Sequence, residues 1–257
     1  DKLAAEQPYG EWVKNIVTLD KIKDAPVTAK AFSRDELRRA QLAFGLTLED
    51  MELILHPMAE DAKEAVGSMG DDTPIAVLSE QYRGLHHFFR QQFSQVTNPP
   101  IDSLREKRVM SLRTRMGNLT NVLDEDARQV AILLLESPCL TNADYARVLK
   151  YAEKMTAKID CTFAVDAGEG ALRDALKRIR GEAENAVRGG AAHIVLTDEG
   201  MNADRAAIPM ILATGAVHSH LVGQGLRTFT SLTVRSGECL DVHYFAVLIG
   251  VGATTVN

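Results

Sequence analysis

The sequence predicts an α/β fold in which βα repeats form a mostly parallel, barrel-like or partly open sheet, preceded by an N-terminal helical portion. The main observation is that strand-like apolar runs alternate with helical patterns over residues 159–257, at intervals of roughly 25 to 35 residues. A second observation is a series of helical patterns over residues 33–66. In such a fold, catalytic loops would follow the strands.

Residues 1–32 mix apolar and charged side chains without a clean period, so we expect an arm or linker there. The helical portion over residues 33–66 opens at Ser33, because Glu36 three residues later completes the spacing of a capping box. Two short helices here could also form a DNA-binding helix-turn-helix. The second of them is acidic and would repel phosphate, so we favour a helical cap.

The central α/β domain is expected over residues 33–257, and residues 67–158 are its first α/β part. Two polar loops marked by glycine or proline flank a short apolar run and an aromatic-rich helix. The apolar run at 130–135 predicts a buried strand or helix. Thr141 then opens a helix to about Met155.

The βα repeats at 159–257 contain four strand-like runs and three helical patterns. Strands are expected at 159–165, 193–197, 228–234 and 253–256, and helices at 171–187, 206–222 and 238–249. A helix between each pair of strands is typical of parallel pairing, because the chain must cross back over the sheet before the next strand begins.

Composition excludes some classes of protein. The net charge of −6 over 257 residues argues against nucleic acid or an anionic membrane as the main partner. Cys139, Cys161 and Cys239 lie far apart without CxxC spacing, so we expect reduced, buried thiols and a cytoplasmic protein. The sequence begins without methionine and ends in a strand-like run, and we expect it to be excised from a longer multidomain polypeptide.

The loop at 198–205 is the strongest candidate for chemistry among the βα repeats. Asp198 and Glu199 follow a predicted strand, where barrel enzymes place acids and bases. An alternative function is therefore a self-sufficient barrel-like enzyme or flavin binder that uses this loop. Two histidine pairs lack the converging third ligand of a zinc site, and the sequence contains neither a P-loop nor a dinucleotide-binding fingerprint.

Several stretches together resemble the central domain of the glutamate synthase large (alpha) subunit. The matching stretches are 67–79, 93–102, 111–118, 192–198 and 235–257. They span nearly the whole chain in the order of that family. The resemblance implies one part of a multidomain oxidoreductase, with no catalytic, cofactor-binding or metal-binding residues in this segment.

The resemblance also implies the chemistry of the parent enzyme. An amidotransferase domain releases ammonia from glutamine, and the ammonia travels inside the protein to an FMN domain, where it joins 2-oxoglutarate and is reduced to L-glutamate. Electrons arrive through a three-iron iron–sulfur cluster, from ferredoxin or from a small NADPH-oxidising subunit. The central domain connects the two catalytic domains and helps wall the ammonia tunnel. This chain has no closely spaced cysteine triplet, so the cluster is expected elsewhere in the enzyme.

The two polar loops within residues 67–102 supply the candidates for the tunnel wall or its mouth. Such a wall must exclude bulk water, because protonated ammonia would be lost from the reaction. The candidates are Met69, Gly70, Asp71, Asp72, Thr73, Thr97 and Asn98. The alternative for these residues is a pair of structural turns buried against the neighbouring amidotransferase and FMN domains.

Overall fold

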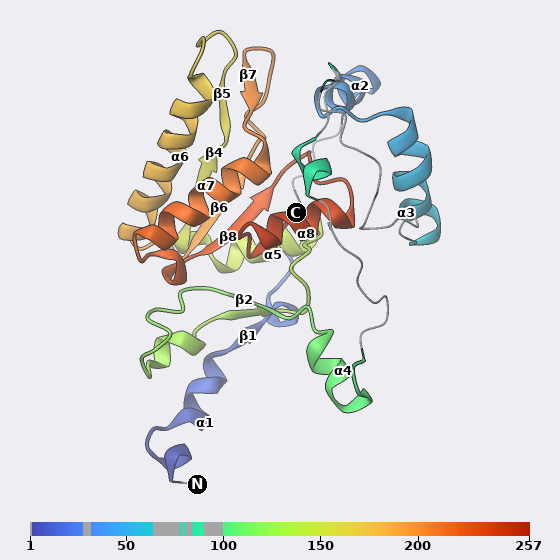
Figure 1. Cartoon of the computed structure of the whole chain (residues 1–257). Helices are drawn as coiled ribbons and strands as arrows, with labels where there is room; N and C mark the ends of the chain where they lie inside the picture. The colour runs from blue at the N-terminus through green and yellow to red at the C-terminus, as the bar shows by residue number, and fades with distance from the viewer. Residues whose placement is uncertain (1, 28–31, 64–77, 79, 81–83, 90–99) are drawn as a thin grey trace. The chain divides into compact units, whose positions relative to one another are not determined.

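The computed structural model of the chain describes residues 2–27, 32–63, 78, 80, 84–89 and 100–257 (Figure 1). The chain divides into two compact units. The sheet unit comprises residues 1–29, 112–236 and 248–257, and the helical unit comprises residues 30–111 and 237–247. The domain boundaries expected from the sequence stay predictions.

A four-stranded parallel sheet forms the centre of the sheet unit. Its strands, in spatial order, are β4 (Thr156–Asp160), β6 (His193–Thr197), β8 (Ser231–Arg235) and β9 (Thr255–Val256). Every residue of β6 is buried, as expected for a central strand covered on both faces. The predicted α/β class and parallel sheet are confirmed. The barrel-like form is not, because the described strands of this sheet form an open row with β4 and β9 at its edges.

Three helices of the sheet unit connect or cover these strands: α5 (Asn142–Tyr151), α6 (Ala171–Arg188) and α7 (Met210–Gly223). Helix α6 buries a stripe of small and apolar residues at helical spacing, formed by Ala175, Ile179, Ala183 and Val187. It packs against β4 and α7, and α6 and α7 run side by side in Figure 1. Helix α8 (Val242–Gly250) contains residues of both units.

A smaller sheet adds a second part to the core of the sheet unit. Its order is β1 (Val17–Thr18), β3 (Leu133–Leu135) and β2 (Thr114–Met116), with β1 parallel and β2 antiparallel to β3. Side chains of β3 pack with α5 and with Val195 of β6. Residues 1–32, expected to be an arm or linker, therefore contribute β1 and the short helix α1 (Tyr9–Trp12) to this unit.

A two-stranded antiparallel sheet replaces part of one predicted strand and one predicted helix. Strands β5 (Thr162–Ala164) and β7 (Arg205–Ala207) pair antiparallel outside the parallel sheet. The prediction of one strand at 159–165 is therefore wrong, and the helix predicted from 206 begins at Met210. The chain leaves the parallel sheet at Cys161, whose backbone N–H still donates to Thr197 O at 2.8 Å while the next residues pair with β7.

The described part of the helical unit contains α2 (Arg34–Ala43), α3 (His56–Asp61) and α4 (Ser103–Val109). The predicted N-terminal helical portion and its capping box are confirmed. Glu36 N donates to Ser33 Oγ at 3.3 Å, and Ser33 N donates to Glu36 Oε2 at 2.9 Å. Among the described residues of the whole chain, no helix is both long and apolar enough to cross a membrane.

Candidate functional site

Polar side chains gather where the strands of the parallel sheet end. Asp160 closes β4, Asp198 follows β6, Arg235 closes β8 and Asn257 follows β9. All four belong to the sheet unit. The carboxyl ends of parallel strands are the usual location of sites in α/β proteins, because loops from several strands converge there. We therefore take this edge as the candidate functional site.

Asp198 links the loop after β6 to the loop after β8. Only 4% of Asp198 is exposed, and Ser236 Oγ donates a hydrogen bond to its Oδ2 at 2.5 Å. A buried carboxylate is costly without hydrogen-bond donors. The sequence predicted Asp198 as a candidate acid in this loop, and in the structure its carboxylate holds two loops together.

Arg235 connects three further elements at the same edge. Its Nε donates to Glu199 Oε1 at 2.7 Å, and its Nη1 donates to Asn257 Oδ1 at 2.6 Å. The guanidinium carbon lies 4.6 Å from the centre of the Tyr145 ring on α5, a cation–π distance. Burial raises the pKa of the Tyr145 phenol to about 12, so this ring stays neutral.

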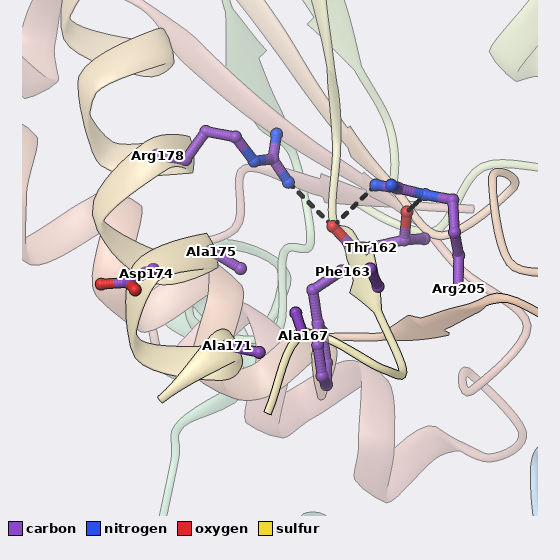
Figure 2. A pocket seen from close by; sticks show the side chains of 9 residues that line it. Thr162, Phe163, Ala167, Ala171, Asp174, Ala175, Arg178 and Arg205 are labelled. Atoms are coloured by element: carbon purple, nitrogen blue, oxygen red, sulfur yellow. Dashed lines mark hydrogen bonds between the residues drawn. The ribbon is translucent and has the colours of Figure 1, made fainter. Parts of the chain in front are cut away.

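A second cluster lies at the end of β4, beside a pocket of 310 Å³ (Figure 2). Arg205 Nε donates to Thr162 Oγ1 at 2.7 Å, and its Nη2 donates to Asp160 Oδ2 at 3.0 Å. Arg178 Nη2 donates to the carbonyl oxygens of Asp160 and Thr162, both at 2.9 Å. Figure 2 shows the two guanidinium groups approaching the Thr162 carbonyl from either side.

The loop at 198–205 is thus divided between two clusters. Asp198 and Glu199 contact residues that follow or end β8, whereas Arg205 contacts the end of β4. Sequence reasoning placed these residues in one loop but missed their partners Asp160 and Arg235. The sequence does offer a signal for these two partners, because a carboxylate lies near the end of one predicted strand and an arginine near the end of another.

The histidine pairs do not form a common site. His220 Nε2 lies 2.7 Å from Glu184 Oε2, whereas His218 Nδ1 accepts a hydrogen bond from Arg227 Nε at 3.1 Å. In the helical unit, burial lowers the pKa of His86 to about 4. Within the described parts of the chain, no three residues of the types His, Cys, Asp and Glu are grouped so that they could hold a metal ion.

The cysteines follow the prediction in part. Cys161 is buried, and burial raises the pKa of its thiol to about 12, so it is a core residue. Cys239 is half-buried, and Cys139 is exposed, so the expectation of buried thiols is wrong for Cys139. Its neighbours Pro138 and Leu140 are both buried, and the alternation of an extended chain then turns Cys139 outward.

The residues predicted to line a tunnel lie outside the described residues. They are Met69, Gly70, Asp71, Asp72, Thr73, Thr97 and Asn98. Their role remains a prediction from the sequence.

The fold defines an α/β domain. The polar residues at the carboxyl ends of its parallel strands bind chiefly to one another. The family model described as the glutamate synthase central domain matches residues 39–257 of this chain. The chain therefore belongs to the glutamate synthase central domain family, and the resemblance seen in the sequence is confirmed.

The similar proteins are glutamate synthases. The chain is 66% identical to the glutamate synthase [NADPH] large chain of Azospirillum brasilense, over 100% of this chain and 17% of that protein. It is 38% identical to the chloroplastic ferredoxin-dependent glutamate synthase of Spinacia oleracea, over 99% of this chain and 16% of that protein. It is 37% identical to the glutamate synthase [NADPH] large chain of Bacillus subtilis, over 100% of this chain and 16% of that protein. The chain thus spans about a sixth of the length of these curated relatives.

Proposed function

We propose that this chain is the interdomain domain of a glutamate synthase large chain, connecting a glutamine amidotransferase domain to an FMN domain and helping to wall the ammonia tunnel between them. The observation that supports this is the family match over 39–257 in relatives about six times longer than the chain. The parent enzyme makes L-glutamate from glutamine and 2-oxoglutarate. The chemistry belongs to the neighbouring domains of the same polypeptide.

The contacts at the carboxyl edge support a positional role. Asp198, Glu199 and Arg205, three of the four charged residues in the loop that a self-sufficient enzyme or flavin binder would use, each bind a side chain of another loop or strand. A general acid or base must instead reach a substrate proton. FMN and the three-iron cluster are assigned to other parts of the polypeptide.

The electron donor is assigned outside this domain as well. The NADPH-named protein of B. subtilis and the ferredoxin-named protein of S. oleracea differ in the donor named, yet they are 37% and 38% identical to this chain. An NADPH-oxidising small subunit is a proposed partner in the NADPH-dependent case. The reduced thiols expected from the sequence support a cytoplasmic location.

The first experiment separates this proposal from the flavin-binding alternative. FMN is titrated into the purified 257-residue chain while its absorbance and fluorescence are followed, and glutaminase and glutamate synthase activities are measured on the same sample. The proposal predicts no saturable spectral change and neither activity. Stoichiometric flavin binding that is lost in Arg205→Gln would favour the alternative.

A further inference from the structure

Three histidine rings lie close together in the helical unit, at the first turn of α8. His86 and His87 belong to the short 3-10 helix η5 (Leu85–Phe88), and His243 belongs to α8. The centre of the His86 ring lies 4.1 Å from that of His87, 4.7 Å from that of Tyr244 and 6.3 Å from that of His243. Tyr244 is only 2% exposed, so the His86 ring packs against a buried side chain of α8.

A hydrogen bond joins the same two helices. His243 Nε2 lies 3.1 Å from the carbonyl oxygen of His86, and a carbonyl oxygen can only accept, so His243 Nε2 carries the hydrogen. Protonation of His243 leaves this hydrogen in place, because both ring nitrogens of an imidazolium carry one. A change in pH therefore acts on this contact through the packed rings and not through the loss of this bond.

The His86 ring is poorly placed to carry a positive charge. Its Nδ1 is buried and has no hydrogen-bond partner among the residues that the structure describes. Gly84 packs on the same edge of the ring, where a Cβ would lie 2.5 Å from Cε1 and 2.6 Å from Nδ1. A protonated His86 would carry N–H at both nitrogens, and would therefore bury an unpaired donor together with its charge.

The titratable groups around His86 act in both directions. Burial lowers the pKa of His86 most, and positive charge on His87 and on His243 lowers it further. The carboxylates of Asp241 and Asp50 raise it, but the net result is a pKa of about 4. His86 therefore stays neutral in the packed helix at pH values where a solvated histidine, with its ordinary pKa of 6.5, binds a proton.

We propose that the contact between residues 84–89 and the first turn of α8 is an acid-sensitive switch, closed while His86 is neutral and released when its ring is protonated. The released segment binds more protons than the packed one between pH 6.5 and about 4, so acid favours release. Acidification from about pH 7 to about pH 5 should raise the equilibrium constant for release about tenfold, once the partial exposure of the ring is taken into account. The proposal does not depend on the proposed role of the chain in glutamate synthase.

The test measures hydrogen exchange of two backbone N–H groups by NMR, in the 257-residue chain at about pH 7 and about pH 5. His87 N donates to Gly84 O and Phe89 N donates to His86 O, both at 3.1 Å, so both report on the closed segment. After correction for the intrinsic pH dependence of exchange, their protection should fall about tenfold. Unchanged protection in the wild type would overturn the proposal.

His86→Phe is the decisive variant, because phenylalanine keeps an aromatic ring against Tyr244 and binds no proton. Its two N–H groups should lose clearly less protection on acidification than those of the wild type. His56→Gln is the matched control, since the His56 side chain is 68% exposed, and it should behave as the wild type does. An equal loss of protection in His86→Phe and the wild type would contradict the role of His86.

A second measurement decides the matter if His86→Phe packs differently at neutral pH. The ring signals of His86 are followed by NMR in the wild type as the pH is lowered. The proposal predicts that His86 takes up its proton well below pH 6.5, together with the change in the N–H signals of His87 and Phe89. Proton uptake near pH 6.5, or without a change at these two N–H groups, would overturn it.

Discussion

His193 should make the four-stranded sheet sensitive to acid. Only 1% of His193 is exposed in β6, and its ring bridges neighbouring strands. Its Nδ1 lies 2.8 Å from Thr156 Oγ1, its Nε2 lies 2.8 Å from Thr233 Oγ1, and Thr233 Oγ1 lies 2.6 Å from Thr255 Oγ1. Burial lowers the pKa of His193 from 6.5 to about 4, because the charged ring would lose its hydration.

The sign and size of the effect follow from the two states of the chain. Unfolded His193 binds a proton near its ordinary pKa of 6.5, whereas folded His193 stays neutral down to about 4. The unfolded state therefore binds more protons in this window, so the free energy of unfolding decreases as the pH falls from 6.5 towards 4. The full shift corresponds to about 3 kcal/mol of stability.

The assay is urea unfolding of the 257-residue chain followed by far-UV circular dichroism, at about pH 7 and about pH 4.5. His193→Gln keeps a hydrogen-bonding side chain that does not titrate, so it should lose less stability on acidification than the wild type. His56→Gln is the matched control, because the His56 side chain is 68% exposed. If His193→Gln and the wild type lose the same free energy of unfolding on acidification, His193 is not the source of the acid sensitivity.

Three further substitutions, one of them with a control, test the core, a helix cap and a hydrogen-bonded arginine by urea unfolding. Leu196→Ala removes a fully buried side chain of β6 and should lower the free energy of unfolding by about 2–5 kcal/mol. The control is Leu212→Ala on α7, where the side chain is 37% exposed, and it should lower the free energy of unfolding clearly less. Thr141→Ala removes the N-cap of α5 and should lower the free energy of unfolding by about 1 kcal/mol. An unchanged unfolding midpoint would show that this cap does not stabilise the helix. Arg227→Met should lower the free energy of unfolding by about 3 kcal/mol or more, because the carbonyl oxygens of Thr230 and Gly252 lose their donor, and a neutral effect would contradict that role.

Elements with a strong local signal were predictable. The apolar run at 193–197 coincides with β6, and the helical pattern at 171–187 gives α6 to within one residue. Ser33 and Thr141 were identified as helix caps because their capping partners lie three residues away in sequence. These features depend on neighbours within one element.

Features that depend on distant partners were missed. The run at 159–165 carries no sign that its two halves join different sheets, since β5 pairs with residues about forty positions away. Val17 pairs in a sheet with a strand more than a hundred residues away, and its N–H donates to Ile132 O. No pattern within residues 1–32 indicates this partner, so the sequence predicts an arm there. The contacts of Asp160 with Arg205, and of Glu199 with Arg235, arise from the order of strands in the sheet, which periodicity does not specify.

The claim that this domain guides ammonia is tested most directly in the complete large chain. The measurement is the amount of glutamate formed from 2-oxoglutarate per glutamine hydrolysed, in Asp72→Ala and Thr97→Ala, with Asp61→Ala, an exposed aspartate of α3, as the control. If these loops wall the tunnel, glutamine hydrolysis continues in the two variants while this ratio falls and ammonia appears in solution. A wild-type ratio in both variants would remove Asp72 and Thr97 from the tunnel and contradict the role assigned to their loops.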